Sequence, residues 1–285
     1  MNTMTVLDPG FLTTVQDLGR PGLAHLGVSG SGAVDPDAHR LANRLVGNPE
    51  SAATLETTLL GVTVTFAHSV VVAVTGARCE LWVGERQAAM LRPVHVPSGS
   101  ALRLGPSAQA RSYLAVSGGI DAPVVMGSRS TDLLSGLGGR PLGCGDRLRI
   151  GLDPGEPRFA DTAIAQRNPG PGIRVLLGPR DDWFADATLE LLDGAKYLVS
   201  AASNRIGLRL QGPELVRRRP GELAPEPMVL GAIQVPPDGQ PVIFLNDHPT
   251  TGGYPVIGVV HPDDLFNCAQ AKPGDPIEFR VVLGP

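Results

Sequence analysis

Lysine is nearly absent from this chain of 285 residues: only Lys196 and Lys272 occur among 24 basic residues. Neither has the flanking residues of a Gly-x-x-x-x-Gly-Lys phosphate-binding loop, so that class of nucleotide site is excluded. No strand-Gly-x-Gly-x-x-Gly-helix unit occurs either, which argues against a dinucleotide-binding domain. Any clamp for phosphate or carboxylate must therefore be built from arginine, whose guanidinium group suits bidentate contacts.

Cysteine is scarce as well. Cys79, Cys144 and Cys268 are odd in number and far apart in the sequence. They form no Cys-x-x-Cys pair, so we expect free thiols in a reducing compartment. The six histidines include no His-x-x-x-His pair, which argues against a histidine metal cluster.

Long apolar runs are missing too. No stretch reaches the roughly 18 apolar residues that a membrane-spanning helix needs. The first residues lack the charged and apolar regions of a signal peptide, so we expect a cytoplasmic protein. The net charge of −4 argues against nucleic-acid binding.

Glycine (36) and proline (27) are abundant and fall between short apolar runs, without a fixed period. This arrangement favours many short strands joined by tight turns, as in an antiparallel barrel or sandwich. The strands predicted in the first half are 62–66, 70–75, 80–83, 94–96, 101–104, 112–116 and 148–150. Those predicted in the second half are 173–177, 197–201, 208–210, 232–235, 242–245 and 277–283.

Three helices are predicted. The first begins after Asp35, a good N-cap, with Pro36 at its first position and an apolar stripe at i, i+3, i+4 and i+7. The second covers residues 182–192, with Trp183, Ala187 and Leu191 on one side. The third covers residues 261–271.

Residues 153–172 are rich in proline, glycine and charge, which is typical of a linker. They separate an N-terminal β-rich subdomain (1–152) from a C-terminal one (173–285). Both halves end in a glycine turn, an aspartate and an alternating strand, at residues 143–150 and 272–279. This similarity favours two related β-rich halves.

The most informative stretch is 246–257, where an apolar run stops at Asp247 and two threonines, two glycines and Tyr254 follow. Such a loop can aim a carboxylate, hydroxyls and backbone N–H groups at one small polar ligand. The alternative is a glycine turn stabilised by its own Asx and Ser/Thr hydrogen bonds.

Other polar clusters lie outside this loop. In residues 14–22 we expect Asp17 and Arg20 to form a structural ion pair. In residues 127–132, Arg129 is either a clamp for an anionic ligand or a turn-stabilising side chain.

Residues 203–207 lie between two predicted strands and offer the side-chain amide of Asn204 and the guanidinium group of Arg205 to a ligand. Gln234 lies in an apolar strand, and a buried amide there needs partners, either within the protein or on a ligand.

Seven motifs occur in a fixed order: 14–22, 29–35, 113–120, 127–131, 203–207, 231–236 and 250–255. Together they resemble the allophanate hydrolase subunit 2 family, also called the biotin-dependent carboxyltransferase C/D-subdomain family. That family includes the C subunit of the bacterial ATP-dependent 5-oxoprolinase. The resemblance covers nearly the whole chain.

The resemblance implies a mainly β fold of two cyclophilin-like β-barrel subdomains with a few short helices. It implies a component of an ATP-dependent complex that hydrolyses the lactam of 5-oxo-L-proline to L-glutamate. The implied partners are a subunit-1-type protein (the B subunit of 5-oxoprolinase) and a LamB/YcsF-type protein (its A subunit). ATP and Mg²⁺ are implied as well, bound by this chain or elsewhere in the complex.

Site residues are implied by position. The catalytic set is Asp247, Arg205 and Arg129, and the substrate-binding set is Asn204, Gln234, Thr250, Thr251, Gly252, Gly253 and Tyr254. The arginines and glycine amides would stabilise developing negative charge, and Asp247 would hold Mg²⁺ or orient water. The family's Ser-Glu-Gly-like segment is replaced here by Ala224-Pro225-Glu226-Pro227, which puts a ligand contact from that segment in doubt.

Two other functions remain open. One is carboxyl transfer from carboxybiotin to urea or a similar amide, with Asn204, Gln234 and Tyr254 binding the carbonyl and N–H groups. This chain has no biotin-accepting Met-Lys-Met tripeptide, so the biotin would have to come from another protein. The other is a non-catalytic, regulatory binding partner of a subunit-1-type protein.

Overall fold

The computed structural model describes residues 2–152 and 168–282, which form two compact units. Unit 1 comprises residues 2–20 and 31–152, and unit 2 comprises residues 21–30 and 168–282. Most of the predicted linker, 153–167, lies outside the described residues. The early segment 21–30 belongs to unit 2, and within that unit the Ser29 hydroxyl donates to the Asn246 carbonyl at 3.0 Å.

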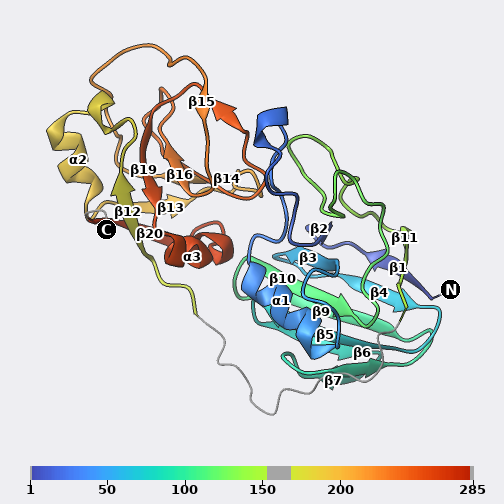
Figure 1. Ribbon diagram of the computed structural model, residues 1–285. Helices are drawn as coiled ribbons and strands as arrows, with labels where there is room; N and C mark the ends of the chain where they lie inside the picture. Colours follow the sequence, from blue (N-terminus) through green and yellow to red (C-terminus); the bar gives the residue numbers. More distant parts are fainter. Residues whose placement is uncertain (1, 153–167, 283–285) are drawn as a thin grey trace. The chain divides into compact units, whose positions relative to one another are not determined.

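Unit 1 consists of two antiparallel sheets (Figure 1). The six-stranded sheet has the order β11 (Arg147–Arg149), β1 (Thr3–Asp8), β4 (Thr63–Phe66), β9 (Ala101–Ser107), β6 (Cys79–Val83) and β7 (Arg86–Ala88). The five-stranded sheet has the order β2 (Leu12–Gln16), β3 (Thr54–Thr58), β10 (Arg111–Val116), β5 (Val70–Gly76) and β8 (Val94–Val96).

The core of unit 1 is one aliphatic cluster to which both sheets contribute. Val64 and Phe66 come from the six-stranded sheet, and Val72 and Leu114 come from the five-stranded sheet. In β4 the buried residues alternate with half-buried threonines, the period-2 pattern of a strand with one face on the core.

Helix α1 (Pro36–Leu45) covers the other face of the five-stranded sheet, beside β5 and β10 (Figure 1). The Asp35 side chain accepts a hydrogen bond from the Ala38 amide at 3.0 Å, as predicted for its N-cap. Ala42 and Leu45 of its apolar stripe pack with Tyr113 of β10. The prediction of this helix is confirmed.

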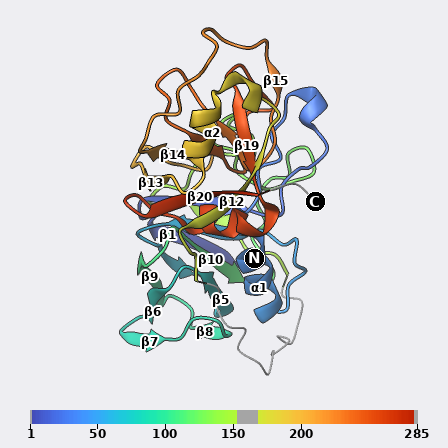
Figure 2. The ribbon, with the colours of Figure 1, turned by 90° about the vertical axis from the view of Figure 1, so that its left-hand side faces the viewer.

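Unit 2 is a closed seven-stranded barrel. Its strands follow the order β12 (Gly172–Leu177), β19 (Val256–Val260), β16 (Ala232–Gln234), β17 (Val242–Phe244), β14 (Gly207–Gln211), β13 (Lys196–Val199) and β20 (Pro276–Val282). Strands β12 and β20 close it as a parallel pair, and they lie side by side in Figure 2. A small ribbon of β15 (Glu226–Pro227) and β18 (Thr251–Gly252) accompanies the barrel.

The second helix differs from its prediction. A 3₁₀ turn (Asp181–Trp183) is followed by two residues in extended conformation, and α2 then covers Asp186–Leu192. This break changes the helical phase, so Thr188 and Leu192 are buried, whereas Ala187 and Leu191 are exposed. The predicted apolar side is therefore wrong. The third helix is confirmed as a 3₁₀ turn (Pro262–Asp264) that continues into α3 (Leu265–Gln270).

The similar ends of the two halves have the same hydrogen bonds. The Gly143 amide donates to the Asp146 carboxylate at 2.7 Å, and the Lys272 amide donates to the Asp275 carboxylate at 3.1 Å. Each turn then pairs with a strand, through Gly145 N to Val6 O and Gly274 N to Val199 O, both at 2.8 Å. The repeat noted in the sequence is thus a repeated structural element.

The mainly β fold class is confirmed. Strands β1, β2, β3 and β19, together with the short β7, β15 and β18, were not predicted from the sequence. Within the described residues, no helix has the length and apolar character needed to cross a membrane.

Candidate functional site

The loop that follows β17 is fastened to residues 223–228 of unit 2. Strand β17 ends at Phe244, and the chain turns at Asp247 and returns as β18, which pairs with β15. The Met228 amide donates to the Thr250 carbonyl at 3.0 Å, and the Leu223 amide donates to the Gly253 carbonyl at 2.8 Å. These bonds fix the backbone of the predicted binding loop.

Gln234 lies under this loop. It is 7% exposed, and its Nε2 donates to the Tyr254 carbonyl at 3.2 Å. Its Oε1 has no hydrogen-bond partner among the described residues and is not fully covered by protein. A Cβ atom added at Gly252 would lie 2.7 Å from Gln234 Nε2, so the glycine is needed for this packing. The structure therefore brings together Gln234, Gly252 and Tyr254.

The hydroxyl groups of the loop face outward. Thr250 and Tyr254 are half-buried and Thr251 is exposed. Across residues 2–152 and 168–282, none of these three hydroxyls has a hydrogen-bond partner. The turn is thus not stabilised by its own threonine side chains, and their donors and acceptors are available to a ligand.

A charged pair beside the loop was not predicted. Arg180, which follows β12, donates through Nε to both carboxylate oxygens of Glu226, at 2.9 and 3.0 Å, and through Nη2 to Oε1. These hydrogen bonds lower the pKa of Glu226 below its ordinary value. Glu226 is the register partner of Gly252. Glu226 belongs to the segment that departs from the family pattern, but no sequence signal connects it to Arg180.

Arg205 and Asp247 form a buried bidentate ion pair. The Nε–Oδ2 and Nη2–Oδ1 distances are both 2.9 Å, and the side chains are 1% and 0% exposed. The Asp247 amide also donates to the Arg205 carbonyl at 3.0 Å. Both carboxylate oxygens therefore face the guanidinium group, an arrangement that holds the start of the loop.

The Mg²⁺ role implied for Asp247 does not fit this arrangement. Its two oxygens are occupied by Arg205, and no group of three or more His, Cys, Asp or Glu side chains among the described residues is placed to hold a metal ion. Hard divalent cations need several oxygen ligands, so these residues offer no Mg²⁺ site.

Asn204 precedes the buried arginine and is exposed. Its Oδ1 accepts a hydrogen bond from the Ile206 amide at 2.8 Å, which is an Asx turn. Its Nδ2 has no partner within the described part of the chain and remains available to a ligand.

Arg129 belongs to unit 1, whereas the other predicted site residues belong to unit 2. Its guanidinium group contacts the Ala122 carbonyl and lies 3.3 Å from the Asp121 carboxylate. Its amide donates to Asp17 at 2.7 Å. These contacts are those of a turn-stabilising arginine.

The predicted Asp17–Arg20 ion pair is wrong. Asp17 accepts hydrogen bonds from the hydroxyls of Ser128 and Ser130, both at 2.6 Å. Arg20 donates instead to the carbonyls of Val125 and Ser130. Two polar clusters that are separate in the sequence thus form one network in unit 1.

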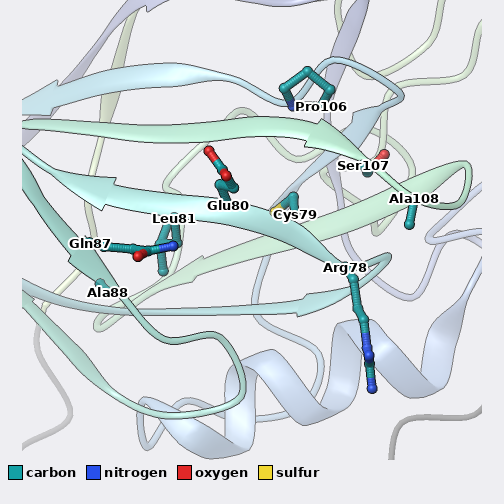
Figure 3. Close-up of a pocket in the computed structure, with 9 residues that line it drawn as sticks. All are labelled: Arg78, Cys79, Glu80, Leu81, Gln87, Ala88, Pro106, Ser107 and Ala108. Atoms are coloured by element: carbon teal, nitrogen blue, oxygen red, sulfur yellow. The ribbon is translucent and has the colours of Figure 1, made fainter.

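Unit 1 also has an open pocket of about 430 Å³ (Figure 3). Its lining residues are Arg78, Cys79, Glu80, Leu81, Gln87, Ala88, Pro106, Ser107 and Ala108. Figure 3 shows the side chains of Arg78 and Glu80 pointing in different directions. Without convergent polar groups, and with none of the predicted site residues in its lining, this pocket is a weaker candidate than the loop of unit 2.

The chain belongs to a family of carboxyltransferase domains. The family model "Carboxyltransferase domain, subdomain A and B" matches residues 26–281. The family resemblance seen in the sequence is therefore confirmed, and its subdomain designation is corrected from C/D to A and B.

Named relatives within this class fall into two groups. The C subunit of 5-oxoprolinase from Escherichia coli (strain K12) is 42% identical over 287 residues, which cover 97% of this chain and 90% of that protein. Its counterpart from Haemophilus influenzae, also named as the C subunit of 5-oxoprolinase, is 34% identical with the same coverage. The urea amidolyase of Lachancea kluyveri is 35% identical over 97% of this chain but only 17% of that protein.

Solved structures share the fold of this chain. TTHA0988 superposes with a TM-score of 0.86 at 36% identity, and the match covers 99% of this chain and 55% of that chain. The urea amidolyase of K. lactis superposes with a TM-score of 0.88 at 34% identity, covering 97% of this chain and 18% of that chain. The chain thus spans about half of one of these solved proteins and less than a fifth of the other.

Proposed function

We propose that this chain is the C subunit of an ATP-dependent 5-oxoprolinase, which hydrolyses 5-oxo-L-proline to L-glutamate. The observation that carries the proposal is the E. coli relative, which is matched over 97% of this chain and 90% of its own length. The proposed partners are a subunit-1-type protein (the B subunit) and a LamB/YcsF-type protein (the A subunit).

The reaction needs activation because resonance makes a lactam amide inert. When bound, ATP would transfer its γ-phosphoryl group to the amide oxygen and leave as ADP. Attack of one water on the carbonyl carbon with cleavage of the ring C–N bond, followed by hydrolysis of the acyl phosphate by a second water, would then give glutamate and phosphate. We propose that ATP and Mg²⁺ are bound by the other subunits of the complex. In this proposal, the role of this chain is to bind and orient the lactam.

The substrate-binding part of the proposal uses the loop of unit 2. The hydroxyls of Thr250, Thr251 and Tyr254 and the amide of Gly253 are the polar groups offered to the ligand, whereas Gly252 pairs with Glu226 in the β15–β18 ribbon. Asn204 precedes β14 at the end of the β14–β17 pair from which the loop leaves, and it contributes its Nδ2 group.

Roles for the three residues assigned to catalysis follow from their contacts. Arg205 and Asp247 are bound to each other in the interior, and the guanidinium group of Arg129 is bound to protein acceptors. We propose that all three are positioning residues, which hold their loops in shape without contacting the reacting atoms.

Carboxyl transfer to urea or a similar amide is the second candidate. It is favoured by the family to which the chain belongs and by the TM-score of 0.88 to the urea amidolyase of K. lactis. The extent of the matches favours the first proposal, because this chain corresponds to 17% of the urea amidolyase of L. kluyveri. A purely regulatory binding role would be contradicted by turnover that depends on this chain.

The test is glutamate release from 5-oxoproline, ATP and Mg²⁺. The chain is assayed alone and with both candidate partner subunits, whose folding and association are checked separately. We expect activity only in the full mixture. Activity of the two partners without this chain, or none in a mixture whose assembly is shown, would overturn the proposal.

A further inference from the structure

We propose that Gln234 Oε1 accepts the N–H group of the substrate's ring amide and so selects a lactam over the corresponding ring ester. This inference rests on the proposed function. It assigns to one atom the recognition of one chemical group, a secondary amide N–H donor.

The orientation of the Gln234 amide is fixed by its surroundings. Nε2 donates to the Tyr254 carbonyl at 3.2 Å. In the flipped orientation two oxygens would face each other, so the network assigns nitrogen to that side and oxygen to the other. Gln234 is 7% exposed, yet its Oε1 has no partner within the described residues. Oε1 keeps some access to solvent, so a donor on a ligand can reach an acceptor that no described protein group occupies.

Gly252 keeps this amide in place. A Cβ atom there would lie 2.7 Å from Gln234 Nε2 and 3.2 Å from Met228 Cε. The φ angle of Gly252 is not positive, so an alanine would be opposed by these contacts and not by backbone strain. Met228 belongs to a small apolar cluster with Val242 and Phe244.

Selectivity follows from the direction of the hydrogen bond. A lactam presents an N–H donor to Oε1, whereas a ring ester presents an oxygen lone pair to the same acceptor. Sites built to hydrogen-bond one such group reject the analogue that lacks it by about 10⁴-fold or more. The assembled enzyme should therefore open 5-oxoproline and leave 5-oxotetrahydrofuran-2-carboxylate, its lactone counterpart, nearly untouched.

The test compares kcat/KM for these two compounds in the assembled complex, with wild-type chain and with Gln234→Met, which keeps the length and removes both polar groups. We expect the variant to lose about 10- to 100-fold in kcat/KM for the lactam, mainly through KM, with no loss for the lactone. The control is Gln240→Met, because Gln240 bonds Gly212 in a surface turn. The Gln240→Met variant should leave kcat/KM for both the lactam and the lactone unchanged.

A second pair of variants addresses the glycine. Gly252→Ala should displace the Gln234 amide and reproduce the loss for the lactam. Gly170→Ala is the matched control, since a Cβ there meets nothing within 4 Å and its φ is not positive. Equal kcat/KM values for Gly252→Ala and wild type would contradict the packing argument.

The wild-type complex alone can overturn the inference. Equal kcat/KM values of the wild-type complex for lactam and lactone would show that Oε1 does not recognise the N–H group. A lactam-to-lactone ratio that Gln234→Met leaves unchanged would contradict the inference independently. A wild-type complex that releases no glutamate would instead contradict the proposed function, so the two failures are distinguishable.

Discussion

The Arg205–Asp247 pair shows how burial changes the role of a charged residue. The sequence offers an arginine and an aspartate next to glycine loops, a composition shared by catalytic sites and structural ion pairs. The pair is covered completely, and each carboxylate oxygen receives one N–H donor at 2.9 Å. Two buried charges persist only when they are paired, so this contact stabilises the native loop and is vulnerable to the loss of either partner.

Removing one partner should therefore be severe. Arg205→Met leaves Asp247 buried without its counter-charge, and we expect the free energy of unfolding of unit 2 to fall by about 3–5 kcal/mol. This fall in the free energy of unfolding is measured by urea denaturation, monitored through the fluorescence of Trp183, the tryptophan of unit 2. Arg280→Met is the control, because Arg280 also belongs to unit 2 and is largely exposed where it contacts Glu278, so its replacement should change the free energy of unfolding little. Equal effects of the two substitutions would contradict the account.

The three cysteines are free thiols, as predicted, and differ in reactivity. Cys144 is exposed, whereas burial raises the pKa of Cys79 to about 11 and that of Cys268 to about 12. Since the thiolate is the reactive form, iodoacetamide at pH 8 should modify Cys144 first. Peptide mass spectrometry identifies the site, and Cys144→Ser should leave the native protein almost unlabelled. Rapid labelling of Cys268 in the native protein would be inconsistent with its burial.

At the scale of elements, α1 and most strands follow from local patterns, whereas β2 and β3 do not. Both belong to the five-stranded sheet, which has the core on one face and α1 on the other. β2 and β3 are each buried at four of their five positions, so no alternation of buried and exposed residues marks them. Polar residues of this sheet are paired inside: Glu56 accepts from the Tyr113 hydroxyl at 2.7 Å and from the Val34 amide at 3.0 Å. Such long-range pairs have no signature in the sequence.

The packing of α1 makes the stability of unit 1 depend on pH. His39 of α1 is fully buried, and burial lowers its pKa from 6.5 to about 4. The unfolded chain binds a proton near pH 6.5 and the folded protein does not, so stability is complete above that pH and is lost as the pH falls toward 4. The loss approaches about 3 kcal/mol, since one pKa unit is worth about 1.4 kcal/mol.

Urea unfolding of unit 1 at pH 7.5 and pH 5, followed by Trp82 fluorescence, measures this loss. His39→Gln should remove most of the difference between the two pH values. His95→Gln, at an exposed position of β8, should leave that difference unchanged. A wild-type stability that rises as the pH falls through this range would contradict the sign of the effect.

At the scale of the whole molecule, the order of seven motifs was sufficient to predict the family. The loop of residues 246–257 could be singled out as a candidate site from its threonines, glycines and tyrosine, because those residue types act locally. The Arg180–Glu226 pair could not, since 46 positions separate the two residues and only the closed barrel brings β12 and β15 to the same loop. The inclusion of residues 21–30 in unit 2 is likewise a tertiary feature without a local signal.

The central claim is that this chain serves lactam hydrolysis and not carboxyl transfer. The most direct measurement offers 5-oxoproline and urea together to the chain assembled with its two proposed partners. ATP, Mg²⁺, bicarbonate, a biotin carboxylase and a biotinylated carrier protein are supplied, so that both reactions are possible, and the products are identified by mass spectrometry. The account predicts glutamate, formed only when this chain is present, and no carboxylated urea. Carboxylated urea without glutamate, or glutamate formed at the same rate without the chain, would contradict it.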